Sequence, residues 1–322
     1  MSVFVMDTDG DQAASSFPSV ASVTTAYNAA AILPRHILAL LQQTRPIQEI
    51  IIVDNGSTDG TRELLARNFP MVTVLDAGGN VGAAGGWAAG LAYAALEKKH
   101  DWIWNFDDDS VPDPAALEVL LADSSEIAGD ATVGILSPLL IHMETGVGYF
   151  PMLWRDRFVK PRREEVLSQS IWYADLVFAS GALVSRRVVE TIGVPLADFF
   201  MDFFDFEYCL RARSHGFKIA VVTKCQISHQ VGNAREIRMG RFRKMWPDYS
   251  PWREYYFTRN IIYAAWWLYP RSKGFVIKHL LRHVLGVLLL SKQRTASLQR
   301  MLQGASDGTK GKLGIRFLPK HN

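Results

Sequence analysis

The chain has 322 residues, of which 48% are hydrophobic and 21% are charged, as is typical of a globular protein with a large core. Its formal net charge of +3 is too small to predict a nucleic-acid partner. Two cysteines, Cys209 and Cys225, exclude a disulfide framework and fit a reducing cytoplasm. We expect residues 1–17 to form a loose arm, because they lack the regions of a signal peptide.

Strands and helices are predicted to alternate over the first 120 residues. Apolar and β-branched runs at 20–26, 49–53 and 72–75 predict strands. Helical patterns follow these runs, and the third begins in a glycine-rich stretch at 78–87. The alternation predicts a doubly wound, mainly parallel α/β sheet, Rossmann-like in its layout.

An apolar run at 102–106 leads directly into three carboxylates, Asp107, Asp108 and Asp109. The run predicts a buried strand, and the acids follow at its carboxyl end, where open α/β sheets bind ligands. Asp107 and Asp109 point to the same side of an extended backbone. Because adjacent carboxylates repel, Mg²⁺ or Mn²⁺ between them would be stabilising. A solvated acidic turn is the alternative.

Later segments predict further strands and a loop. Residues 134–136, 174–178 and 218–222 have strand patterns, and 179–182 is a small-residue turn. Residues 151–170 are charged and contain proline, which predicts a loop that orders when ligand binds.

A second group of carboxylates lies among aromatic residues before a predicted helix. We interpret Glu207 as a helix-start residue paired with Arg211. We expect apolar neighbours to raise the pKa of Asp205, which suits a general base. Asp202 is the competing candidate. The neighbours of Asp205 are Phe203, Phe204, Phe206 and Tyr208.

Four segments in this order resemble glycosyltransferase family 2 enzymes with the GT-A fold. They are residues 52–59, residues 80–86, the three acids from Asp107 to Asp109, and residues 205–211 followed by His229. Each motif is common, but the ordered set, which spans residues 20–232, is specific. The resemblance implies an inverting enzyme that moves a sugar from a nucleotide-sugar donor to an acceptor hydroxyl.

The resemblance also implies roles for single residues. Asp54 would contact the uracil or thymine of the donor, and Asp107, Asp109 and His229 would hold Mn²⁺ or Mg²⁺ against the diphosphate. Asp205 would be the catalytic base. Phe204 departs from the pattern, since many relatives carry an acid there. The residues assigned to the nucleotide sugar are Thr25, Tyr27, Asp54, Asn80, Gly85, Gly86, Trp87, Asp107 and Asp108.

Donor and acceptor follow from the same resemblance. Residues 80–87 and 102–109 are most similar to bacterial galactofuranosyltransferases, whereas residues 202–211 and 255–260 also resemble rhamnosyltransferases. We therefore expect UDP-galactofuranose as donor, with dTDP-rhamnose as the alternative, and a lipid-linked or polysaccharide acceptor of the cell envelope. A non-catalytic nucleotide-sugar or glycan-binding protein would share the pocket but would not need Asp205.

We predict a catalytic domain at 18–235, with a nucleotide-sugar half (18–125) and an acceptor half (126–235), and a helical C-terminal region at 236–322. This region is rich in aromatic and basic residues. It includes an amphipathic helix at 273–292, in which Lys278 and His283 belong to the polar side. Such a helix fits peripheral binding to the inner face of the cytoplasmic membrane. A homo-oligomer (dimer) interface or a helix packed in the core fits nearly as well.

Overall fold

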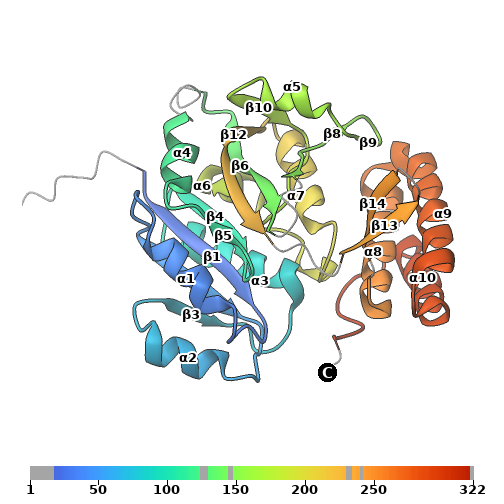
Figure 1. Cartoon of the computed structure of the whole chain (residues 1–322), viewed down its shortest axis with the longest axis horizontal. Coiled ribbons are helices and arrows are strands. Elements are labelled where there is room, and N and C mark those ends of the chain that lie inside the picture. Colours follow the sequence, from blue (N-terminus) through green and yellow to red (C-terminus); the bar gives the residue numbers. More distant parts are fainter. Residues whose placement is uncertain are drawn as a thin grey trace, which may run out of the picture.

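The structure is a computed structural model that describes residues 18–123, 130–143, 148–229, 234–239, 242–247 and 249–319. The arm expected at 1–17 lies outside the described residues. Figure 1 shows a sheet with helices on both faces and a group of C-terminal helices beside it.

Four parallel strands and their connecting helices form the first half of the sheet, as predicted. The strands are β1 (Val20–Ala26), β2 (Glu49–Asp54), β3 (Thr73–Asp76) and β4 (Trp102–Asp107). The helices are α1 (Leu33–Leu41), α2 (Thr61–Asn68) and α3 (Gly82–Leu91), which continues as the π-helical turn η1 (Ala92–Glu97).

The second half adds shorter strands and more helices. Its strands are β5 (Val111–Pro112), β6 (Val133–His142), β7 (Gly148–Tyr149), β8 (Leu153–Trp154), β9 (Phe158–Val159), β10 (Ile171–Ala174), β11 (Leu183–Ser185) and β12 (Lys218–His229). Its helices are α4 (Ala116–Asp123), α5 (Arg163–Leu167), α6 (Arg186–Ile192), the 3-10 turn η3 (Ala197–Phe199) and α7 (Phe204–Ser214).

The main sheet has the order β10-β12-β6-β11-β4-β1-β2-β3, with β5 paired to β12 and β7 paired to β6. β11 runs antiparallel to β4 and β6, and β10 runs antiparallel to β12. The other pairs along this order are parallel, which confirms the predicted α/β class.

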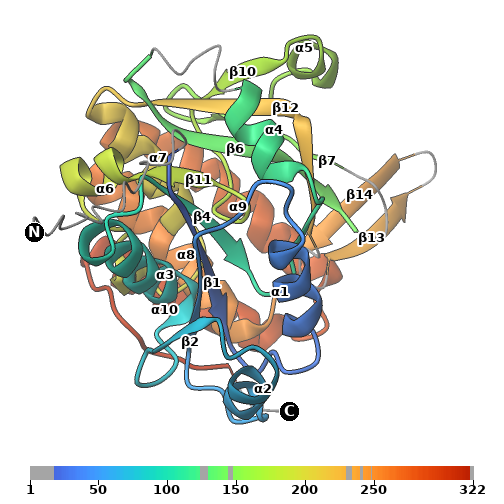
Figure 2. The ribbon, with the colours of Figure 1, turned by 90° about the vertical axis from the view of Figure 1, so that its left-hand side faces the viewer.

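Alternating strand residues supply two cores, one on each face of the sheet. In β2, Ile51 and Val53 pack with residues of α3, α6 and α7, whereas Ile50 and Ile52 pack with residues of α1, α2 and α4. This is the two-residue period expected of a strand covered on both faces. Figure 2 shows α1 and α3 on opposite sides of β1.

The strand predicted at 174–178 is wrong, because only Ala174 belongs to β10 and the next strand begins at Leu183. Asp175 instead accepts a hydrogen bond from the Trp154 backbone N–H at 2.6 Å and forms ion pairs with Arg155 and Arg213. A buried carboxylate requires such partners. These contacts hold the β8–β9 hairpin, which stands where a loop was predicted.

The C-terminal region begins with a hairpin, so the boundary predicted between residues 235 and 236 falls inside a strand. The hairpin consists of β13 (Ala234–Met239) and β14 (Phe242–Pro247). Helices follow: α8 (Pro251–Tyr263), the π-helical turn η4 (Ala264–Leu268), the 3-10 turn η5 (Pro270–Ser272), α9 (Lys273–Leu290) and α10 (Arg294–Thr309). Among the helices of the described ranges, none has the length and apolar character needed to cross a bilayer.

α9 buries a histidine of its polar side and exposes leucines of its apolar side. His283 is buried, where its Nε2 lies 2.7 Å from Glu254 Oε2 and its ring stacks on Trp246. Leu281 and Leu285 are 66% and 56% exposed. Glu254 and Trp246 provide the buried histidine with a charge partner and a stacking surface, which leaves the leucines on the outer face.

Candidate active site

The carboxyl ends of the central parallel strands meet at one edge of the sheet. Thr25 of β1 pairs in register with Asp107 of β4, and Ala26 pairs with Asp54 of β2. The register therefore places Thr25, Asp54 and Asp107 at the same level. Tyr27 follows directly, and its backbone N–H lies 3.4 Å from Asp108 Oδ2.

The three predicted metal ligands form a cluster. One ligand atom from each of Asp107, Asp109 and His229 lies within 4.8 Å of the others. His229 ends β12, which reaches this edge because Ser228 pairs with Val111 of β5. Its Nε2 lies 3.7 Å from Asp107 Oδ2, and its Nδ1 lies 3.0 Å from Asp109 Oδ1.

The electrostatics of the cluster fit a divalent cation. Desolvation raises the pKa of Asp107, and repulsion from Asp109 adds to the effect although His229 opposes it. Desolvation, Asp109 and Asp107 raise the pKa of Asp108 to about 7. Asp109 Oδ1 is buried and finds no aligned hydrogen-bond donor among the described residues. Two carboxylates and an imidazole are donors that Mn²⁺ and Mg²⁺ accept, and a cation would relieve this repulsion.

A buried hydrogen-bond network, which the sequence did not predict, contacts His229 of the cluster. Ser110 Oγ lies 2.9 Å from His229 Nδ1 and 2.7 Å from Ser180 Oγ. His36 Nδ1 lies 2.6 Å from the Ser110 carbonyl oxygen, and its Nε2 lies 2.8 Å from Thr24 Oγ1. A carbonyl oxygen only accepts hydrogen bonds, so His36 carries its proton on Nδ1, and its Nε2 accepts a hydrogen bond from the Thr24 hydroxyl. Burial lowers the pKa of His36 to about 4, which keeps it neutral.

Asp54 lies against a cation. Its carboxylate accepts hydrogen bonds from the Ser57 backbone N–H and from Arg62, which also binds Asp76 at the end of β3. The Asp54 side chain has no exposed surface, whereas 42% of the Arg62 side chain is exposed. At this position the buried Asp54 carboxylate therefore pairs with a partly exposed guanidinium.

The glycine-rich start of α3 packs closely against the sheet. A Cβ on Gly86 would lie 2.3 Å from Thr25 Cγ2, so only glycine allows this approach of helix and strand. Gly85 is buried beside it, and Asn80 accepts a hydrogen bond from the Gly82 backbone N–H at 2.9 Å. Trp87 is buried, and its Nε1 has no hydrogen-bond partner among the described residues.

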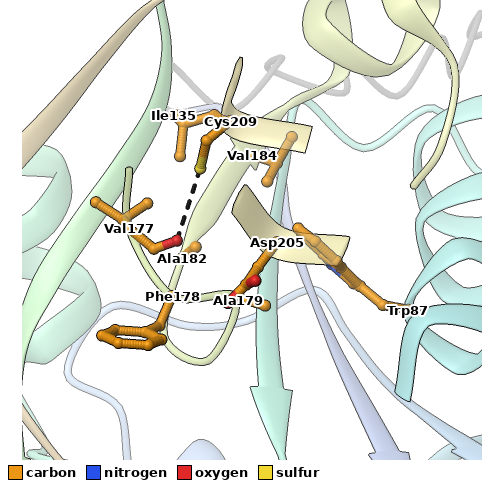
Figure 3. Close-up of a pocket in the computed structure, with 9 residues that line it drawn as sticks. All are labelled: Trp87, Ile135, Val177, Phe178, Ala179, Ala182, Val184, Asp205 and Cys209. Carbon is orange, nitrogen blue, oxygen red and sulfur yellow. Dashed lines mark hydrogen bonds between the residues drawn. The ribbon is translucent and has the colours of Figure 1, made fainter. Parts of the chain in front are cut away.

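Asp205 lies in the first turn of α7 and lines a small, mostly apolar cavity together with Trp87, Phe178 and Ala179. Figure 3 shows its carboxylate between Trp87 and Ala179. Desolvation, together with the charges of Asp202 and Asp107, raises the pKa of Asp205 to about 7. The direction is the one predicted from its aromatic neighbours, and the influence of Asp107 links Asp205 to the metal-ligand cluster.

Asp202 has a different environment from Asp205. Arg253 of α8 donates to both of its oxygens, through Nε at 3.0 Å and Nη2 at 2.7 Å. A bidentate ion pair of this kind occupies lone pairs of both carboxylate oxygens. Asp205 has no such cation partner among the residues that the structure describes, so the two candidates for the base differ clearly.

The segment before α7 is strained. Phe200, Asp202 and Phe203 have φ angles of 64°, 59° and 69°, a region that side-chain-bearing residues rarely adopt. Each such residue costs on the order of 1–3 kcal/mol and persists only where its surroundings enforce it. Phe203 is also the N-cap of α7, so this strained segment determines where the helix that carries Asp205 begins.

Comparison with known proteins finds similarity to glycosyltransferases. A family model described as glycosyl transferase family 2 matches residues 22–171. Galactofuranosyltransferase GlfT1 of Mycobacterium tuberculosis H37Rv is 28% identical over 252 residues, which cover 75% of this chain and 80% of that protein. The dTDP-rhamnosyl transferase RfbF of Shigella flexneri is 24% identical over 212 residues, covering 66% and 68%.

Two solved structures share the fold at low identity. S. aureus TarS superposes with a TM-score of 0.54 and 13% identity over 91% of this chain. GalNAc-T7, crystallised with UDP, GalNAc and Mn²⁺, gives 0.57 and 14% over 92%. This chain spans 49% and 56% of their lengths, about half of each. Residues 22–171 match glycosyltransferase family 2, and the relatives and the mixed sheet support a glycosyltransferase with a GT-A-like fold.

Proposed function

We propose that the protein is an inverting, metal-dependent galactofuranosyltransferase that uses UDP-galactofuranose and a lipid-linked or polysaccharide glycan acceptor. The observation that carries this proposal is the pairing of two groups at one sheet edge. The cluster of Asp107, Asp109 and His229 suits the donor diphosphate. Asp205, with its pKa raised to about 7, suits the acceptor hydroxyl.

The chain's own residues divide the work of the reaction. Asp205 would remove the proton from the acceptor hydroxyl as its oxygen attacks the anomeric carbon on the face opposite the diphosphate. A bound Mn²⁺ or Mg²⁺ would neutralise the charge that develops on the leaving diphosphate. Trp87 Nε1, a buried donor without a partner among the described residues, is available to a sugar oxygen beside Asp205. A single displacement of this kind needs one protein base and inverts the anomeric configuration.

The donor is proposed from the relatives. The GlfT1 relative is a galactofuranosyltransferase and covers more of this chain than the dTDP-rhamnosyl transferase RfbF. GalNAc-T7 was crystallised with UDP and Mn²⁺, which favours a uridine diphosphate and a divalent ion at the shared fold. We assign the donor to Thr25, Tyr27, Asp54, Asn80, Gly85, Gly86, Trp87, Asp107 and Asp108, as the resemblance implies.

The exposed face of α9 supports peripheral binding to the inner face of the cytoplasmic membrane. Its outer surface carries large exposed apolar side chains together with the exposed basic residues Lys278 and Arg282. An exposed face with both apolar and cationic side chains fits an anionic lipid surface. The exposed apolar residues are Ile277, Leu281, Leu285, Leu288 and Leu289.

Donor choice is tested by product formation with UDP-galactofuranose and dTDP-rhamnose, each offered with a lipid-linked glycan acceptor. We expect turnover with UDP-galactofuranose and little with dTDP-rhamnose. The reverse result would change the donor but leave the fold and chemistry in place. Binding of a donor without any product would instead favour a non-catalytic binding protein.

Chelation tests the metal cluster. EDTA should abolish transfer and Mn²⁺ or Mg²⁺ should restore it, and His229→Ala should raise the metal concentration for half-maximal activity by about tenfold or more. His215→Ala, at an exposed histidine that ends α7, is the control and should behave as the wild type. Full activity in EDTA would contradict metal dependence, and an unchanged requirement in His229→Ala would make His229 a structural residue.

Asp205→Asn should lower turnover by roughly 10²- to 10⁴-fold, because the amide keeps the shape of the carboxylate but cannot accept a proton. Donor affinity should barely change. Only the ionised base is active, so wild-type turnover should rise as the pH passes through about 7 and be lost below it. The variant should lack this dependence.

Asp198→Asn, at an exposed carboxylate in the same segment, is the matched control for Asp205→Asn and should retain activity. Near-normal turnover in Asp205→Asn together with loss in Asp202→Asn would move the base to Asp202.

Vesicle sedimentation tests the α9 surface. Each basic residue near an anionic membrane contributes about 1 kcal/mol, so Lys278→Glu with Arg282→Glu should reduce binding more than tenfold, as should high salt. Arg67→Glu with Lys98→Glu makes the same charge change at exposed positions of the catalytic domain and should retain binding. Absence of vesicle binding, with concentration-dependent self-association lost in the Leu281→Ser, Leu285→Ser variant, would favour an oligomer interface.

A further inference from the structure

We infer that Asn260 of α8 is a positioning residue for the catalytic base, with Arg259 as its support. The inference rests on the proposed role of Asp205. It extends the site into the C-terminal region, beyond the residues 22–171 that match the family model.

Asn260 binds the strained segment directly. Its side chain is fully buried, and its Nδ2 shares its two hydrogens among the backbone carbonyls of Phe199 at 3.0 Å, Met201 at 2.6 Å and Asp202 at 2.9 Å. Each of these carbonyls directly precedes a residue with a positive φ angle, namely Phe200, Asp202 or Phe203. One amide group therefore holds together the turn that would otherwise relax toward ordinary backbone angles.

Arg259 fixes the orientation of that amide. Its Nε donates to Asn260 Oδ1 at 2.9 Å, which identifies the other side-chain atom of Asn260 as the donor toward the turn. Its Nη2 donates to the carbonyls of Asp198 and Phe199, both at 2.9 Å, and its Nη1 donates to the Gly314 carbonyl. The buried guanidinium thereby connects α8, the C-terminal segment and the turn.

The turn connects Asn260 to both halves of the active site. Phe203 caps α7, and Asp205 is the second residue of that helix. On the other side, the Phe200 carbonyl accepts a hydrogen bond from the Ala84 backbone N–H of α3 at 3.1 Å. A relaxed turn would therefore shift the base relative to the donor site. Misplacement by about 1 Å is enough to cost on the order of a hundredfold in rate.

Asn260→Leu tests this role, since leucine fills a similar volume but has no donor. We expect kcat to fall by roughly ten- to a hundredfold, while the KM for the donor and UDP binding change little. Asn260→Ser, which keeps one donor, provides a second variant if leucine prevents folding, and it should lose less activity. The control is Thr258→Val on the same helix, because the buried Thr258 hydroxyl has no hydrogen-bond partner in the described ranges.

A double-mutant cycle separates positioning from stability. A residue that acts through Asp205 adds no further loss of kcat when Asn260→Ser is combined with Asp205→Asn. Multiplied losses in the double variant, or an unchanged kcat in folded Asn260→Leu, would overturn the inference. Full activity in Asp205→Asn would instead refute the proposed base itself, so the two failures are distinguishable.

Discussion

Repulsion among carboxylates at one edge of the sheet is the constraint that the rest of the site accommodates. Asp107, Asp108 and Asp205 each have a raised pKa, because burial and neighbouring acids penalise their charged forms. Each cationic group nearby offsets part of this cost: His229 lies against Asp109, and Arg253 binds Asp202. A divalent cation at Asp107 and Asp109 would offset a further part, so the chemistry proposed for the site and its electrostatics favour the same kind of ion.

The same constraint explains why two neighbouring acids can differ in function. Asp202 and Asp205 are three residues apart, yet one has a bidentate arginine and the other has an apolar cavity. An ion-paired carboxylate is a weak base, whereas a desolvated one holds a proton more readily near neutral pH. Phe204, which departs from the acid common in relatives, adds to the apolar surroundings of Asp205 by packing edge-on against Trp87 at 5.8 Å.

Local sequence patterns predicted the features that depend on local periodicity. The buried run of β4 placed Asp107 and Asp109 at a sheet edge, and the strand before His229 brought it there as well. Residues brought together only by folding were missed, such as His36 and Ser110, which are 74 positions apart. The strand predicted at 174–178 was wrong for a related reason, because Val177 and Phe178 line the cavity beside Asp205 instead of pairing in the sheet.

The C-terminal region, which was predicted to associate with the membrane or the acceptor, also contacts the segment before α7. The segment before α7 contains three strained residues, Phe200, Asp202 and Phe203. Their combined cost of several kcal/mol is a large part of the stability of a typical domain. Asn260 and Arg259 supply donors to four of the carbonyls around these residues. If α9 binds the membrane or a second subunit, that contact would lie next to α8, the helix that carries Asn260 and Arg259. Such an arrangement would tie the location of a membrane-bound acceptor to the geometry of Asp205, the proposed base.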